Sequence, residues 1–76
     1  MERVVLITWH LGMQKIAFNQ LLGEHCGLTL ALAKEVSDAL LAGRRPMVEF
    51  QTEKQAGRFI AEARQLGVVA ELVLKH

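Results

Sequence analysis

The sequence predicts an α+β fold, a two-layer sandwich in which three helices cover one face of a three-stranded antiparallel sheet. Two observations lead to this prediction. Three short runs are rich in valine and other apolar residues, and three longer segments repeat apolar residues every three or four positions. They follow one another in the order β-α-α-β-α-β with no linker and no internal repeat, so residues 1–76 are expected to form a single domain.

The strands are predicted at residues 4–9, 47–51 and 68–74. The first is a nearly unbroken run of β-branched and aromatic residues, which favour extended backbone. The second follows Pro46, because a proline forces the residue before it out of the helical region. In this strand Val48 and Phe50 alternate with polar residues, which is typical of a strand with one buried face.

The first helix is predicted to begin at Met13 and to end before Gly27, since glycine readily takes the left-handed conformation that closes a helix. The spacing of its apolar residues predicts a buried face made of Phe18, Leu21, Leu22 and His25. The opposite side is expected to present Lys15, Asn19 and Gly23 to solvent.

Threonine residues are predicted to cap the other two helices. The hydroxyl of Thr29 can accept from unpaired amides at the start of the second helix, and Thr52 with Gln55 forms a capping-box pattern before the third. The second helix is expected to end at Gly43 and the third at Gly67. The expected buried positions are Ala33, Val36, Ser37 and Leu40 in the second helix, and Ala56, Phe59, Ile60, Ala63 and Leu66 in the third.

The overall composition narrows the classes of partner. The net charge is only +1, whereas proteins that bind nucleic acid or anionic membranes usually have a clustered basic surface. A single cysteine, Cys26, excludes an intrachain disulfide, and without a signal-peptide pattern the expected compartment is the reducing cytoplasm. The longest apolar runs are far too short to cross a bilayer, so no membrane association is expected.

The order of elements and several residues resemble the C-terminal domain of the bacterial ribosomal stalk protein, which shares its superfold with the ClpS-type adaptors. The likeness runs from about Val4 to Leu74, and most of it lies in the segment GLTLALAKEVSD. The matching residues are Gly12, Lys15, Ile16 and Ala17, then Gly27, Leu28, Leu30, Ala33 and Lys34, and finally Gly67 at the end of the last helix.

This resemblance implies a module that binds proteins and catalyses no reaction. In the stalk domain, translation factors dock on the two-helix face, and the ClpS-type adaptors deliver substrates to a protease. The resemblance therefore implies a translation-related or proteolytic protein partner, bound on the same face. The candidate partner-binding residues are Lys15, Asn19, Gln20, Gly23 and Lys34.

The sheet has a second candidate surface on the side away from the helices. Strict alternation directs Val4, Leu6 and Thr8 of the first strand toward the helices, together with Val68, Ala70, Leu72 and Leu74 of the last. The open face would then present Val5, Ile7, Trp9, Val69 and Val73. Apolar patches of this kind usually mark an interface, and tryptophan is enriched in binding hot spots. This face is expected to associate with a second copy or with another protein.

Two alternatives remain at this point. His10, His25 and Cys26 could form a small enzymatic or metal site, although no motif with metal-ligand spacing accompanies them. Association with RNA could involve Lys15, Lys34, Arg44 and Arg45. The sequence favours the interaction module over both, with no catalytic residues, no metal and no cofactor expected.

Overall fold

The computed structural model describes residues 1–73, and the predicted α+β fold is confirmed. The elements are β1 (Glu2–Trp9), α1 (Lys15–Cys26), α2 (Leu30–Leu41), β2 (Met47–Phe50), α3 (Glu53–Gln65) and β3 (Val68–Val73). The predicted last strand residue, Leu74, lies outside the described residues.

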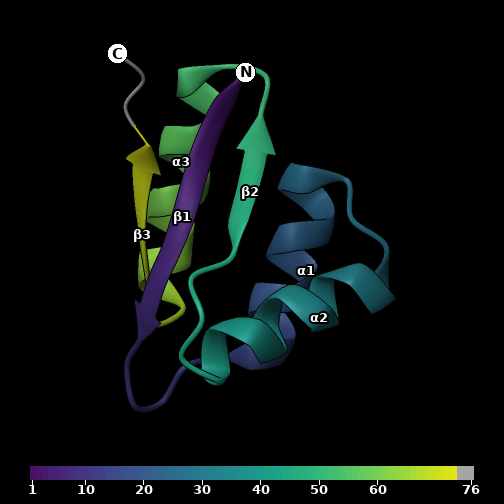
Figure 1. Cartoon of the computed structure of the whole chain (residues 1–76), viewed down its shortest axis with the longest axis vertical. Helices are drawn as coiled ribbons and strands as arrows, with labels where there is room; N and C mark the ends of the chain where they lie inside the picture. The colour runs from purple at the N-terminus through teal and green to yellow at the C-terminus, as the bar shows by residue number, and fades with distance from the viewer. Residues whose placement is uncertain (74–76) are drawn as a thin grey trace.

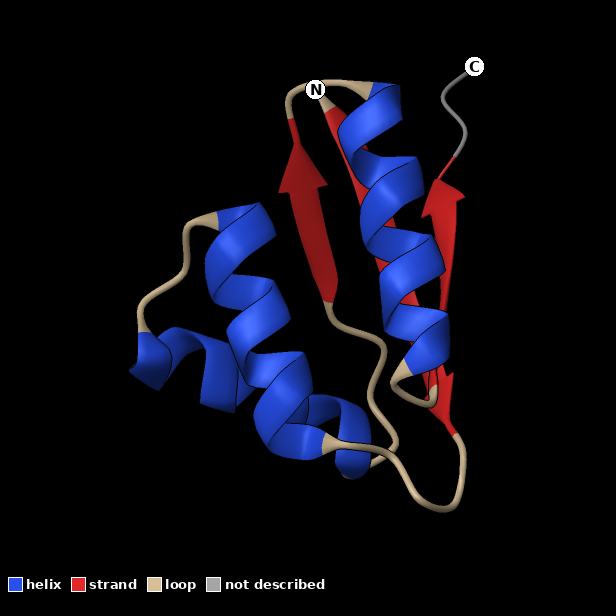
Figure 2. Cartoon of the chain, turned by 180° about the vertical axis from the view of Figure 1, so that it is seen from behind, coloured by secondary structure: helices blue, strands red, loops and turns tan. Residues whose placement is uncertain are grey.

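The sheet and the helices form two layers (Figures 1 and 2). α3 lies along one face of the sheet, and α1 lies beside α3 and extends the helical layer past β2. α2 packs against α1, and the two helices form a hairpin next to the edge of the sheet. The opposite face of the sheet, which is turned toward the viewer in Figure 1, carries no helix. We call it the open face.

β1 is the central strand of the sheet, which has the order β2-β1-β3 with both neighbours antiparallel. Leu6 lies opposite Ala70, but Thr8 lies opposite Val69, so β1 contains one extra residue at Ile7. Such a bulge shifts the alternation of side chains by one position.

The bulge makes two sequence predictions wrong. Thr8 was expected to face the helices, but it is exposed opposite Val69, whose side chain is on the open face. Trp9 was expected on the open face, but it lies opposite Val68, which is fully buried on the helical side. Trp9 therefore belongs to the helical side, at the end of the sheet, where 38% of its surface is exposed. The extra residue of a bulge is left unpaired, and its position depends on how two strands distant in the sequence pair, so local alternation does not reveal it.

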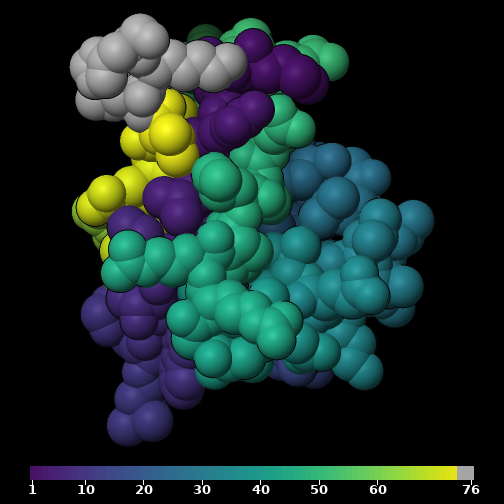
Figure 3. Space-filling view, viewed as in Figure 1, coloured from purple at the N-terminus to yellow at the C-terminus, as the bar shows by residue number. Residues whose placement is uncertain are grey.

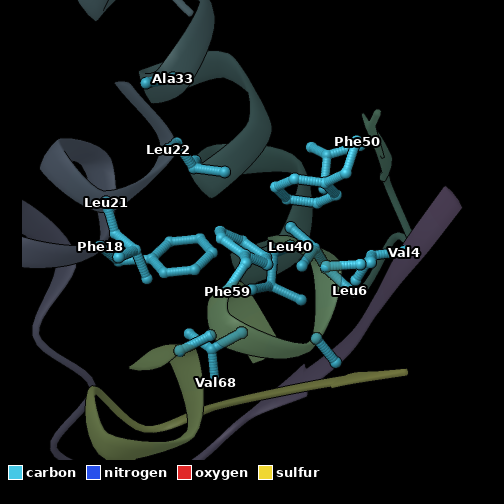
Figure 4. Close-up of a cluster of buried hydrophobic side chains, with 14 residues drawn as sticks. Val4, Leu6, Phe18, Leu21, Leu22, Ala33, Leu40, Phe50, Phe59 and Val68 are labelled. Atoms are coloured by element: carbon cyan, nitrogen blue, oxygen red, sulfur yellow. The ribbon is translucent and has the colours of Figure 1, made fainter. Parts of the chain in front are cut away.

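The core lies between α3, the hairpin and the sheet, and three phenylalanine side chains form its centre (Figure 4). The ring centroid of Phe59 lies 6.1 Å from that of Phe18 and 5.1 Å from that of Phe50. Most of the predicted core positions are buried as expected: Phe18, Leu21, Leu22, Ala33, Ser37, Leu40, Val48, Phe50, Ala56, Phe59 and Ala63. Each helix and each strand thus contributes buried apolar residues to a single core.

The ends of the helices also follow the predictions. The Thr29 hydroxyl accepts from the Leu32 amide at 3.2 Å, and the Thr52 hydroxyl accepts from the Gln55 amide at 3.2 Å. Gly27 closes α1 with a φ of 67°, in the left-handed region. α1 begins at Lys15, two residues later than predicted from Met13. The amide of Gln14 donates instead to the Leu66 carbonyl at 3.0 Å, so the segment before α1 is held by the end of α3.

Candidate functional site

The five predicted partner-binding residues all lie on the hairpin of α1 and α2, but they do not all face solvent. Lys15 Nζ donates to Asp38 Oδ1 at 2.6 Å, and the buried Ser37 hydroxyl donates to Asn19 Oδ1. Lys15 and Asn19 therefore face α2, not the solvent side that helical spacing alone predicted for them. The two bonds join α1 and α2 where the helices cross (Figure 1).

The Lys15–Asp38 pair reduces the charge available to a partner. The hydrogen bond from Lys15 lowers the pKa of the Asp38 carboxyl, and the positive charge of Lys34 adds to this effect. An exposed pair of this kind contributes little to folding stability. Its main consequence is that the positive charge of Lys15 is already balanced by the Asp38 carboxylate, whereas Lys34 forms no ion pair within residues 1–73.

The rest of the hairpin's outer side is more apolar than the sequence indicated. Ile16 has 78% of its surface exposed and Leu30 has 76%. Ile16, Gln20 and Gly23 follow one another at spacings of four and three along α1, so they share one side of that helix. Leu30, Lys34 and Asp38 follow one another at spacings of four along α2, so they also share one side of their helix. Asp38 is the member of this row that contacts Lys15 of α1. The hairpin surface, as we define it, consists of Ile16, Gln20, Gly23, Leu30 and Lys34.

Sequence reasoning missed Ile16 and Leu30 as members of this surface. The signal was present at Ile16, because an isoleucine interrupts the polar side of α1. A shallow hollow beside it is lined by Gln14, Lys15, Ile16, Ala17 and Gln20. At Gly23, an added Cβ would lie 3.5 Å from the nearest atom, the Leu28 carbonyl oxygen, which is an ordinary contact. Packing within the chain therefore does not require a glycine there, although glycine weakens a helix interior.

The open face of the sheet is less apolar than predicted. Its Val5, Ile7, Val69 and Val73 are half-buried, and Trp9 does not belong to it. Figure 3 shows the three strands side by side on this face, in purple, green and yellow. Met47, opposite Val5, adds a side chain that is 55% exposed. Charged side chains interrupt the apolar patch. Arg3 Nε lies 3.7 Å from Glu49 Oε2, and Glu71 is exposed on the same face.

The alternative site residues are not gathered into one cluster. His25 Nε2 lies 2.5 Å from Glu62 Oε2, and its ring packs edge-on against Phe59 with 6.1 Å between centroids. His10 is exposed beyond the end of β1. Within residues 1–73 no group of three or more histidine, cysteine or acidic side chains is arranged to hold a metal ion. Arg44 and Arg45 are both exposed in the loop before β2.

The thiol of Cys26 is expected to react slowly. Burial raises the pKa of Cys26 to about 11, so near pH 8 the reactive thiolate should be roughly two orders of magnitude scarcer than in a free cysteine. Alkylation by iodoacetamide should be slow in the native protein and fast in denaturant. Equal rates in the two states would contradict this prediction.

Because folding favours the neutral thiol, the contribution of Cys26 to stability is present below its unfolded pKa and is lost as the pH rises toward about 11.

Comparison with protein-family models, with curated proteins and with solved structures finds no match to this chain. Among the described residues, no helix has the length and apolar character needed to cross a membrane.

Proposed function

We propose that this protein is a non-enzymatic interaction module that binds a partner protein through the hairpin surface. The observation that carries the proposal is the pair of exposed aliphatic side chains, Ile16 and Leu30, on two helices that pack together and are joined by the Ser37–Asn19 hydrogen bond. Burying one such side chain contributes about 1.5–3 kcal/mol, and a rigid surface loses little conformational freedom on binding.

The chemistry of the surface defines the partner in part. Two aliphatic side chains would fit into apolar pockets of the partner, and Lys34 favours an acidic group beside them. The resemblance to the ribosomal stalk domain and to the ClpS-type adaptors remains a prediction. It points to a partner in translation or proteolysis, in the cytoplasm.

Replacing both aliphatic residues with serine (Ile16→Ser and Leu30→Ser) is expected to abolish partner binding while the fold is retained, since both side chains are exposed. The measurement is quantitative affinity capture from a native extract, with circular dichroism to check folding. Leu32→Ser is the matched control, because Leu32 is also an exposed leucine, at 48%, but on another side of α2. A partner that the double variant retains as well as the wild type would contradict the proposal.

A second proposal is self-association through the open face, supported by the exposed Met47 beside Val5 and Ile7. Sedimentation at increasing concentration is expected to show a dimer, and Met47→Lys should weaken it by at least about tenfold by placing a charge in the apolar interface. Trp9→Ala should have little effect, because Trp9 lies on the other side of the sheet. A monomer at every concentration tested would exclude a homodimer.

A further inference from the structure

The free edge of β2 has backbone groups that no other part of the described chain uses. The Leu6 amide donates to the Pro46 carbonyl at 2.9 Å, which makes residues 6 and 46 a hydrogen-bonded antiparallel pair. Because such pairs alternate along an antiparallel ladder, Val48 and Phe50 also bond to β1. The amides and carbonyls of Met47 and Glu49 therefore point away from β1, and none of them pairs with another element within residues 1–73.

A hollow of about 360 Å³ lies beside this edge. The hairpin lines it with Cys26, Leu28 and Val36, and β2 lines it with Met47, Val48 and Glu49. In Figure 3 the border between the green of β2 and the blue and teal of the hairpin lies on the face shown. Apart from Glu49, the side chains named are apolar, and the volume is at the lower end of the range of roughly 300–1,000 Å³ for small ligand sites.

We propose that this edge binds an extended peptide, which adds as a strand to β2 and inserts one aliphatic side chain into the hollow. Unpaired edge groups give affinity in such complexes, and pockets for alternate side chains give specificity. The alternation of the strand fits the hollow. A peptide residue opposite Val48 would direct its side chain to the same side as Val48, toward Leu28 and Val36. Its two neighbours would point to the open face, beside Met47 and Glu49.

The neighbouring hairpin favours a single peptide strand over a second folded copy of the chain. α1 contacts β2 and the hairpin extends past the edge of the sheet, so it would collide with another sheet and its helices. An added strand needs only about 5 Å beside β2. The partner chemistry is thus an extended segment with a polar–aliphatic–polar pattern. This surface is distinct from the hairpin surface, so the two proposals can fail separately.

The test is an NMR titration of the whole chain with the peptide acetyl-Lys-Thr-Thr-Leu-Thr-Thr-Lys-amide. The amides of Met47 and Glu49 are expected to shift downfield and to exchange more slowly with solvent, and alkylation of Cys26 should slow. The same peptide with aspartate in place of leucine should bind at least about tenfold more weakly, since its charge would be buried unpaired. A peptide methylated on the backbone nitrogens of both threonines flanking the leucine should lose binding, because in an antiparallel added strand those two amides donate to the Met47 and Glu49 carbonyls.

Two protein variants complete the test. Glu49→Pro removes the backbone N–H that points away from β1 and leaves every hydrogen bond between β2 and β1 in place, so it should abolish peptide binding. Glu49→Ala keeps this N–H and should retain binding. If Glu49→Pro does not fold, the methylated peptide serves the same purpose. The absence of any shift at saturating peptide, or equal binding of the methylated peptide, would overturn the proposal. So would slower solvent exchange of the same amides with rising protein concentration alone, which would identify a second copy paired at the edge, because a dimer through the open face would leave these backbone amides exposed to solvent. Binding lost in the variant with Ile16→Ser and Leu30→Ser would place the peptide on the hairpin surface instead.

Discussion

Phe59→Ala is expected to remove about 3–5 kcal/mol from the free energy of unfolding, a third or more of the whole stability of the protein. Phe59 is fully buried, and its ring meets those of Phe18, Phe50 and His25 from α1 and β2. Truncating a buried phenylalanine costs about 3–5 kcal/mol, because the contacts are lost and a cavity remains. At about 0.05–0.15 kcal/mol per residue, a chain of 76 residues has a total stability of only about 4–11 kcal/mol.

Chemical denaturation followed by circular dichroism measures this loss. Arg58→Ala is the control. The Arg58 side chain is next to Phe59 in the sequence but is exposed on the outer side of the same helix, so this substitution should change the free energy of unfolding by less than about 0.5 kcal/mol. A loss below about 1 kcal/mol for Phe59→Ala would mean that the three rings do not form the centre of the core.

Gly67→Ala is expected to produce the second largest loss, about 2–4 kcal/mol, from two separate causes. Gly67 has a φ of 90°, which disfavours any side chain, and an added Cβ would lie only 3.0 Å from the Met13 Cα. That atom belongs to the backbone, so the segment before α1 would have to move. The Gly67 carbonyl also accepts from the His10 amide at 2.8 Å, and this bond would be strained.

Gly57→Ala is the matched control for the chemistry of the substitution. Gly57 lies within α3, with nothing within 4 Å of an added Cβ, so alanine should stabilise the protein by about 0.5–1 kcal/mol. The two variants are thus expected to move the thermal midpoint in opposite directions. A stabilised Gly67→Ala variant would show that α1 does not depend on its contact with the end of α3.

The candidate surfaces were less predictable from the sequence than the fold. Helical spacing placed Lys15 and Asn19 with Gly23 on a solvent side, but the position of α2 turns the first two toward Ser37 and Asp38. Whether a side chain on the flank of a helix is exposed depends on which neighbour packs there and at what angle, and spacing within one helix contains no such information. The exposure of Leu30 was hidden for the same reason, whereas Ile16 lies on the polar side of α1 and could have been recognised from the sequence.

The sequence by itself determined the order of the elements, the stripes that form the core and most of the helix ends. These features depend on periodicity, on capping hydroxyls and on glycine, which act over a few residues, as the bonds of Thr29 and Thr52 illustrate. Tertiary structure alone decided the bulge at Ile7, the side of the sheet on which Trp9 lies, and the hollow between β2 and the hairpin. Each of these arises where segments distant in the chain meet, and pairing across such distances is set by the packing of the whole molecule.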